Sequence, residues 1–239
     1  MFWDVARRVK DEDLFIKDRA IHFLNLLDNP SQLLSWDKVE DCINNTVFYE
    51  FEIIDGGEKA HISRQERAWV SNKEVQSSKE IAKYISDGKT FIITNYGYHS
   101  RETQELLKVF ESEFDVDCAM HAYGGIKGSK SFNIHNDFPP VFIFQIDGET
   151  NWKVYKNRVS DLYLPSSYEQ KTISDKDLEL DIEVLLKPGD ALYVPSRCYH
   201  CASPDGRRLS ISIPCWTKTL NLNKSADRYY YHIQNLDTI

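Results

Sequence analysis

The chain has 239 residues, of which 41% are hydrophobic and 28% are charged, and its formal net charge is −8. This profile excludes disordered and fibrous proteins, and the length suits one principal domain. The negative charge disfavours general nucleic-acid binding, and no apolar run approaches the roughly 18 residues of a membrane span, so we expect neither partner.

The cellular compartment can be inferred from the N-terminus and the cysteines. Residues 1–15 become charged too soon for a secretory signal, and the five cysteines are odd in number and irregularly spaced. Both features argue against a secreted disulfide framework. We therefore expect a cytoplasmic protein with reduced cysteines.

The first half of the chain mixes helical and strand patterns. Residues 12–45 carry helical spacing for two helices, the second beginning after Ser35 as its N-cap. An aromatic and β-branched run at 46–54 predicts a strand that stops at Gly56 and Gly57. Helices are then predicted over 78–88, closed by Gly88, and over 100–114, with a buried strand at 90–95 between them.

From residue 116 onward the pattern changes to short strands separated by turns. Seven strands are predicted, at 117–123, 130–135, 141–146, 150–156, 182–187, 191–195 and 208–214. Strands of this length and spacing indicate a sandwich or an open barrel. We expect a single domain over 1–239, with a helical or mixed collar at 1–115, a β core at 116–216 and a C-terminal helix at 217–239.

The stretch "SFNIHND" (131–137) carries two potential metal ligands, His135 and Asp137. Residues i and i+2 of a strand point to the same face, so both side chains would aim at one point. His200, just past an apolar strand, is a third candidate. Two histidines and one carboxylate leave three coordination positions open, which suits non-haem Fe(II).

A zinc site is the alternative for this region. "CYHC" at 198–201 could combine with Cys118 and His121. A single C-x-x-C is weak evidence, and His200 serves the other pattern, so the zinc interpretation is disfavoured.

Two segments resemble a known family. "GDALYVPSRCYH" is similar to the second cupin motif, G-x5-P-x-G-x2-H, with Gly189, Pro195 and His200 in register and Arg197 where the family usually has Gly. "HNDFPPVFIFQIDGETNWKVY" resembles the JmjC-like cupins of the ribosomal-oxygenase branch. The matching residues are His135, Asp137, Gln145, Gly148 and Trp152. The resemblance covers roughly residues 80 to 216.

The resemblance implies a fold and a chemistry. The expected fold is mainly β with flanking helices: a double-stranded β-helix (cupin or jelly-roll) core with an N-terminal helical collar. His135, Asp137 and His200 would hold Fe(II), with 2-oxoglutarate as cosubstrate and O₂ as oxidant. Such enzymes hydroxylate an unactivated C–H bond and convert the cosubstrate to succinate and CO₂. Relatives often pair, so a homodimer through the terminal helices is consistent with the resemblance.

The cosubstrate anchor departs from that pattern. Members of the branch commonly place a Lys or Arg two residues before the matching Trp, where this chain has Thr150. Arg208 could replace it if the polar face of strand 208–214 looks inward, whereas Lys153 needs a bulge to reach the same face. Tyr123 sits where relatives place a tyrosine that contacts the cosubstrate carboxylate.

Three further residues are weaker candidates for the pocket. His121 shares a face with Tyr123, and Asn133 shares one with His135, so both could reach the cosubstrate. Gln145 could also do so, but it could equally be a buried amide that serves strand packing.

The leading functional hypothesis is an Fe(II)- and 2-oxoglutarate-dependent oxygenase that hydroxylates a protein or peptide side chain. A small-molecule or natural-product hydroxylase on the same scaffold is the first alternative. The second is a cupin that binds a metal or ligand without oxidation, for which Thr150 is the main support.

Overall fold

A computed structural model of the chain describes residues 2–10, 12, 18–66, 74–128, 132–158 and 173–217. The elements, in chain order, are α1 (Phe2–Lys10), β1 (Ile21–Phe23), η1 (Pro30–Gln32), α3 (Trp36–Asn44), β2 (Glu50–Asp55), β3 (Glu58–Ala60), β4 (Arg64–Glu66), β5 (Glu74–Gln76), α4 (Ser78–Ser86), β6 (Thr90–Thr94), η2 (Tyr96–Tyr98), α5 (Arg101–Phe114), β7 (Val116–Cys118), β8 (His121–Gly125), β9 (His135–Asn136), β10 (Val141–Asp147), β11 (Thr150–Arg158), η3 (Asp175–Asp177), β12 (Leu180–Leu186), β13 (Ala191–Val194), β14 (Cys198–Pro204) and β15 (Arg208–Thr217).

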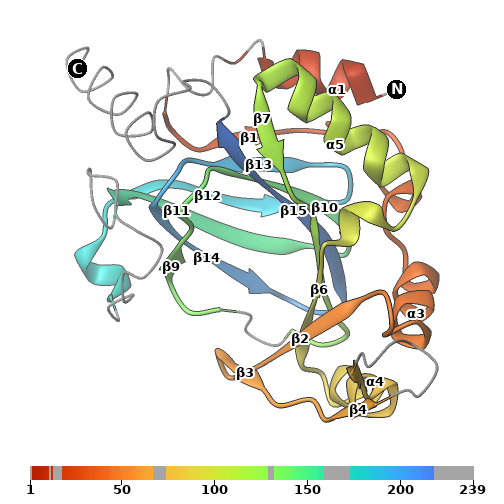
Figure 1. The fold of residues 1–239 in the computed structure, drawn as a ribbon. Helices are drawn as coiled ribbons and strands as arrows, with labels where there is room; N and C mark the ends of the chain where they lie inside the picture. Colours follow the sequence, from red (N-terminus) through yellow and green to blue (C-terminus); the bar gives the residue numbers. More distant parts are fainter. Residues whose placement is uncertain are drawn as a thin grey trace, which may run out of the picture.

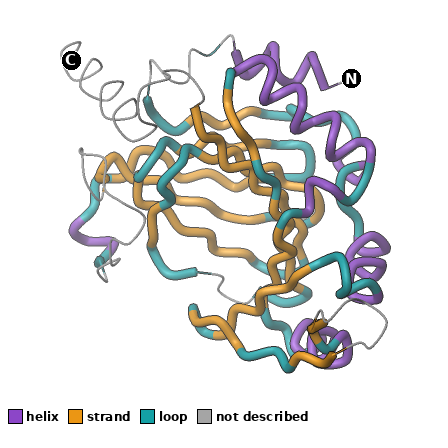
Figure 2. Tube along the Cα trace, viewed as in Figure 1, coloured by secondary structure: helices purple, strands orange, loops and turns teal. Residues whose placement is uncertain are grey.

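Two antiparallel sheets form the body of the molecule. The larger follows the order β1-β13-β10-β15-β8-β6-β2-β3, with β7 also paired to β15, and the smaller follows β12-β11-β14-β9. Figure 1 shows helices α1, α5 and α3 on one side of the larger sheet, and Figure 2 shows how strands dominate the described chain. The expected mainly β fold with flanking helices is confirmed.

Side chains that alternate between the two faces of the central strands divide the hydrophobic core into two clusters. On β10, Phe142 and Phe144 join the cluster that includes α5, where the rings of Phe110 and Phe142 lie 5.0 Å apart in an edge-on arrangement. Ile143 points the other way and packs with Val154 of the smaller sheet. Successive side chains of a strand point to opposite faces, so β10 serves the helical layer and the interior between the sheets at once.

Helix boundaries follow the predicted capping residues Ser35 and Gly88, and a cap that was not predicted begins α5. The Ser35 side chain accepts a hydrogen bond from the backbone N–H of Lys38 at the start of α3. Gly88 follows α4 with a φ of +90°, the left-handed conformation that glycine adopts without strain. Helix α5 begins with a capping box between Ser100 and Thr103. The predicted helices over 78–88 and 100–114 and the strand at 90–95 are confirmed.

The expectation of two helices over 12–45 is wrong at residues 21–23, which form β1 and pair with β13. Residues 13–17 of the first predicted helix lie outside the described residues. The turn that follows is held by Asp190, whose carboxylate accepts from the backbone N–H of Asn25 at 2.9 Å. Pairing with a distant strand therefore overrides the local helical spacing. Helix α1, with buried Phe2 and Val9, was not predicted.

Strand boundaries also differ from the expectation. The strand predicted at 46–54 begins only at Glu50, and that predicted at 130–135 is confined to His135–Asn136. The segment 117–123 is divided between β7 and β8, and β14 was not predicted as a strand. The C-terminal helix expected at 217–239 falls, apart from Thr217, outside the described residues.

Residues on both sides of position 115 share the larger sheet. β6 pairs with both β2 and β8, so it joins strands of the expected N-terminal collar to strands of the expected β core. The first half therefore supplies strands to the main sheet as well as helices.

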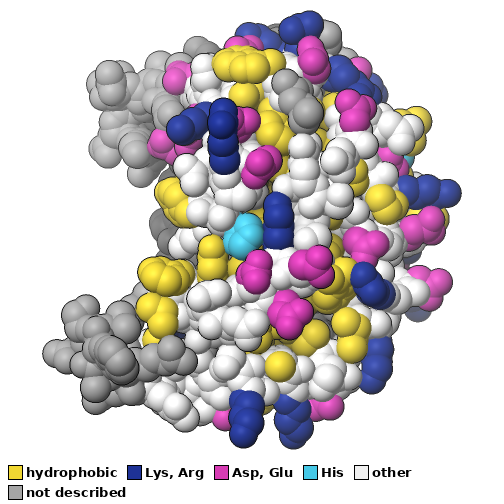
Figure 3. Space-filling view, turned by 90° about the vertical axis from the view of Figure 1, so that its right-hand side faces the viewer, with side chains coloured by type: hydrophobic (Ala, Val, Ile, Leu, Met, Phe, Trp, Pro, Cys, Tyr) yellow, Lys and Arg dark blue, Asp and Glu magenta, His cyan; other side chains and the backbone are white. Residues whose placement is uncertain are grey.

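The charged surface and the absence of disulfides among the described residues agree with what the composition predicts. Figure 3 shows acidic and basic side chains interspersed over the face that it draws. No helix in the described ranges has the length and apolar character needed to cross a bilayer. None of the five cysteines, all of which lie in the described ranges, forms a disulfide, although the sulfurs of Cys118 and Cys215 lie 3.5 Å apart.

Candidate metal centre

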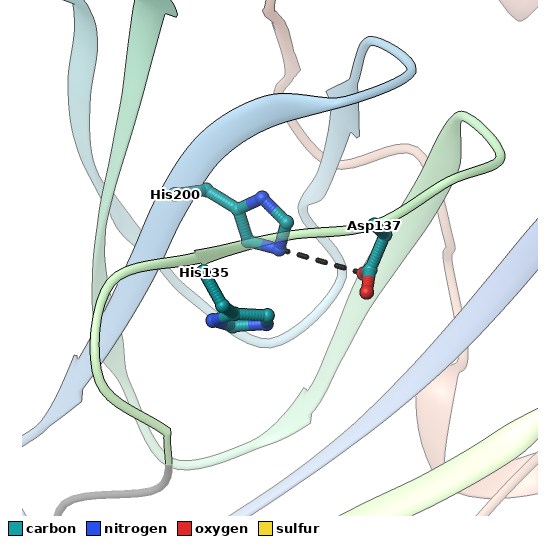
Figure 4. A group of neighbouring side chains, drawn as sticks. All are labelled: His135, Asp137 and His200. Carbon is teal, nitrogen blue, oxygen red and sulfur yellow. Dashed lines mark ion pairs between the residues drawn. The ribbon is translucent and has the colours of Figure 1, made fainter. Parts of the chain in front are cut away.

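Three side chains from two neighbouring strands converge between the sheets. His135 lies on β9, Asp137 follows it directly, and His200 lies opposite His135 in the β14–β9 pairing. One ligand atom from each residue lies within 4.8 Å of the other two. Figure 4 shows the two imidazoles and the carboxylate directed toward one another. Residues 65 positions apart in sequence (200 − 135) thus meet as cross-strand neighbours.

Backbone carbonyls orient both imidazole rings. The Nδ1 of His135 lies 2.8 Å from the carbonyl oxygen of Asn133, and the Nδ1 of His200 lies 2.9 Å from that of Cys198. A carbonyl can only accept, so each Nδ1 carries a proton and Nε2 is the nitrogen that a metal can reach. A hydrogen bond from the ring nitrogen that does not face the metal is the usual way in which proteins orient metal-binding histidines.

The electrostatics of the three groups are coupled. Burial and the neighbouring His200 lower the pKa of His135 to about 4, so its ring is neutral near pH 7. Burial acts to lower the pKa of His200, but the carboxylate of Asp137, 3.5 Å away, raises it overall. For Asp137, burial acts to raise the pKa, and the bond and charge of His200 lower it overall. A divalent cation could take the place of the proton that this pair shares.

The turn after β13 forms hydrogen bonds with the backbone at Asp137 and Phe138. The backbone N–H of Arg197 donates to the carbonyl of Asp137 at 2.7 Å, and the Ser196 hydroxyl donates to that of Phe138 at 2.6 Å. Arg197 has a φ of +63°, a left-handed conformation in which glycine is the unstrained residue. This explains why the cupin pattern has Gly at the position that Arg197 occupies here.

The three groups line a cavity of about 360 Å³ between the two sheets. Its walls come from β2, β3, β6, β8, β10, β11, β14 and β15. Its polar, charged and indole side chains are those of Glu52, Lys59, Thr94, His121, Tyr123, His135, Asp137, Thr150, Trp152, His200, Arg208, Ser210 and Ser212.

Four of the residues predicted to approach a cosubstrate line this cavity. Tyr123 and His121 project from β8, Thr150 from β11 and Arg208 from β15. Burial raises the pKa of Tyr123, whose hydroxyl is hydrogen-bonded with Ser212, so it remains protonated. His121 Nδ1 lies 3.4 Å from the backbone N–H of Asn95.

Three other predicted residues do not line the cavity. Lys153 lies on the opposite face of β11 and forms an ion pair with Asp175 at 3.2 Å. The Asn133 side chain is exposed beside Gly57, and its contribution to the site is the carbonyl that holds His135. The Gln145 amide donates to the carbonyls of Asp147 and Gly148, which fits the strand-packing interpretation.

The zinc alternative is not supported by these positions. Among the described residues, the triad is the one group of three or more His, Cys, Asp or Glu whose ligand atoms converge. Cys118 lies beside Cys215, on β15, and His121 faces the cavity instead of the cysteines of β14.

Sequence reasoning did not find the cavity residues of the N-terminal half. Glu52 and Lys59, from β2 and β3, form an ion pair at 2.8 Å, and Thr94 comes from β6. The alternation of strands 46–54 and 90–95 could have shown which residues share a face, but not that this face meets the metal ligands.

A family profile and curated proteins match this part of the chain. The profile described as "JmjC domain" matches residues 96–222. Ribosomal oxygenase 1 of Gallus gallus is 29% identical over 115 residues, which are 47% of this chain and 19% of that protein. Ribosomal oxygenase 2 of Mus musculus is 34% identical over 114 residues, 47% of this chain and 23% of that protein. The chain spans about a fifth of the length of these curated relatives.

Solved structures share the fold. A structure of YcfD, a ribosomal oxygenase from Escherichia coli, in complex with cobalt and succinic acid superposes with a TM-score of 0.58 at 16% identity. The superposition covers 92% of this chain and 53% of that one. A second structure, with cobalt and 2-oxoglutarate, gives a TM-score of 0.56 at 15% identity. The expected JmjC-like cupin fold is therefore confirmed.

Proposed function

Because the chain belongs to the JmjC domain family, we propose that it is an Fe(II)- and 2-oxoglutarate-dependent oxygenase. The observation that carries the proposal is the triad of His135, Asp137 and His200 at a cavity between the sheets. Two neutral imidazoles and a carboxylate suit Fe(II) and leave part of its coordination sphere open to a cosubstrate. A structure of a fold relative in complex with cobalt and 2-oxoglutarate supports the same assignment.

Each residue of the triad has a defined task in this proposal. His135 and His200 would bind iron through Nε2, which the carbonyl bonds at Nδ1 leave free. Asp137 would supply one oxygen and compensate part of the cation's charge. The bound iron would supply the oxidation of a C–H bond by O₂, coupled to conversion of 2-oxoglutarate to succinate and CO₂. The protein contributes the binding and orientation of the reacting groups.

The substrate is proposed to be a protein or peptide side chain. Support comes from the relatives, whose names include ribosomal oxygenases and, in Dictyostelium discoideum, a bifunctional lysine-specific demethylase and histidyl-hydroxylase. A small-molecule hydroxylase and a metal-binding cupin without turnover are the alternatives.

Succinate formation tests the activity. Purified protein with Fe(II), 2-oxoglutarate and a ribosomal protein extract is expected to form succinate only when O₂ is present. His135→Ala and Asp137→Ala should abolish both manganese binding and succinate formation, because each removes one of three ligands. His61→Ala, at an exposed histidine outside the cavity, is the matched control. Retained manganese binding in both ligand variants would refute the triad.

Mass spectrometry separates the remaining functions. A protein hydroxylase would add about 16 Da, the mass of one oxygen, to a component of the extract. Succinate formed with small molecules but not with proteins would favour the first alternative. Metal binding with no O₂-dependent succinate under any condition would favour the non-oxidative cupin, and loss of methyl groups from methylated lysine peptides would indicate demethylation.

A further inference from the structure

The cavity contains a buried cation that no acidic side chain neutralises among the described residues. Arg208, on β15, is 3% exposed and lines the cavity. Its Nη2 donates to the hydroxyl of Thr90 at 3.1 Å, and its Nη1 has no hydrogen-bond partner in the described part of the chain. Burial alone lowers the pKa of Arg208, to about 10. A buried guanidinium without a counter-charge is costly unless a ligand supplies one.

The fold provides a specific seat for this guanidinium. Gly125 lies opposite Arg208 in the β8–β15 pairing, and a Cβ placed on it would come within 3.3 Å of Nη1. A Cβ on the preceding Gly124 would lie 2.4 Å from the ring of Phe91. The two glycines therefore allow β8 to approach β6 closely and leave room for the guanidinium beside Thr90. The position of the cation is determined by three strands.

The opposite wall carries two more polar atoms without partners. The Thr150 hydroxyl and the Trp152 indole N–H, both on β11, are buried, line the same cavity and lack hydrogen bonds among the described residues. Unsatisfied buried polar atoms are rare in proteins, and three that line one cavity indicate a ligand. Two of the three groups can only donate, so the missing ligand must present acceptor atoms.

The acidic residues of the cavity are already engaged elsewhere. Glu52 pairs with Lys59 at 2.8 Å, and Asp137 pairs with His200 at 3.5 Å. The acceptor for Arg208 must therefore come from outside the described residues, and a carboxylate matches a guanidinium in both charge and geometry.

We propose that Arg208 binds the carboxylate of 2-oxoglutarate that is remote from the metal, with Thr150 and Trp152 as the facing hydrogen-bond partners. The anchor is thus on β15, and Thr150 of β11 contributes a hydroxyl in place of a cation. Thr90 is a positioning residue, since it contacts the guanidinium through Nη2. This inference rests on the proposed function, because it assumes that 2-oxoglutarate enters the cavity.

Calorimetric binding to manganese-loaded protein tests the anchor without turnover. Two ligands are compared: 2-oxoglutarate, and 2-oxobutanoate, which has the same oxoacid group but no second carboxylate. A charge-assisted hydrogen bond is worth about 1.5–3 kcal/mol, so the native protein should prefer 2-oxoglutarate by about 10- to 100-fold. Arg208→Met should remove this preference and leave the affinities for manganese and 2-oxobutanoate unchanged.

Two further variants examine the geometry. Thr90→Val should weaken 2-oxoglutarate binding by about 2- to 10-fold, because one hydrogen bond that orients the guanidinium is lost, without affecting 2-oxobutanoate. Thr150→Lys in the Arg208→Met background should restore the preference, because it returns a cation to the same cavity from the facing strand. A double variant no better than Arg208→Met would overturn the placement of Thr150 at the carboxylate.

The outcomes for the two proposals differ. If the native protein binds manganese but not 2-oxoglutarate, the proposed function fails. If the native protein binds 2-oxoglutarate and Arg208→Met keeps the full preference over 2-oxobutanoate, only the anchor fails. Loss of manganese binding in Arg208→Met would also overturn the anchor, since its effect would then act on the metal centre.

Discussion

The ligand-free protein should become more stable when Arg208 is replaced by Met. Burial lowers the pKa of Arg208 from 12.5 to about 10, and this difference of 2.5 corresponds to about 3–4 kcal/mol at about 1.4 kcal/mol per pH unit. A basic group with a lowered pKa destabilises the folded state at every pH at which the group is charged there. The full free-energy cost of burying the Arg208 charge is therefore present at neutral pH and disappears only as the pH rises from about 10 to 12.5.

The expected gain is smaller than this cost. Met also removes the hydrogen bond from Nη2 to the Thr90 hydroxyl, which is worth about 1 kcal/mol. The net gain is then about 2–3 kcal/mol. For a chain of this length it corresponds to a rise in Tm of about 4–12 °C.

Thermal unfolding with and without ligand measures the effect. Without ligand, Arg208→Met should unfold at a higher temperature than the native protein. With manganese and 2-oxoglutarate at about 100 times its Kd, the native protein gains about 2.7 kcal/mol and the variant gains less, so the difference should disappear or reverse. A ligand-free variant that unfolds several degrees below the native protein would refute the reasoning, because the guanidinium would then be stabilising the empty fold.

Three further substitutions test the framework. Gly148→Ala should destabilise by at least about 1–2 kcal/mol in urea unfolding, because its φ is +66° and the new Cβ would lie 1.9 Å from the carbonyl oxygen of Arg207; an unchanged midpoint would contradict this turn geometry. Asp190→Ala should cost about 3 kcal/mol or more, since two backbone N–H groups lose their acceptor, and a loss below about 1 kcal/mol would show that the contacts are dispensable. Ser100→Ala should cost about 0.5–2 kcal/mol through loss of the α5 capping box, which helix content during thermal unfolding would report.

Local signals were sufficient for the helices that begin and end with defined capping residues. Ser35, Ser100 and Gly88 mark helix boundaries because their side chain, or its absence, meets a requirement of the adjacent backbone. The segment 18–27 carries no such marker. Its conformation depends on β13 and on Asp190, about 170 residues away in sequence, which no local pattern records.

The convergence of the three candidate metal ligands could be predicted, but the cavity could be predicted only in part. The spacing of His135 and Asp137, together with the resemblance of the segment around His200 to a cupin motif, indicated a shared site. Strand β14 was missed because Cys198, His200 and Ser203 give a weak strand pattern, and its pairing with β11 and β9 supplies the order. Glu52 and Lys59 line the cavity because β2 and β3 extend the larger sheet beside β6. The alternation of side chains within one strand does not reveal the order of strands in a sheet.

The pairing of β6 with β8 has a practical consequence for dissecting the protein. A fragment trimmed to the matched residues 96–222 would keep every metal ligand but lose β6, and with it Thr90 and the neighbour of β8. Without β6, the backbone N–H and C=O groups on that edge of β8 would be unpaired and could pair with strands of other chains. We therefore expect such a fragment to aggregate. The segment matched by the family profile is therefore unsuitable for expression by itself, and a fragment meant for expression should retain the first 95 residues.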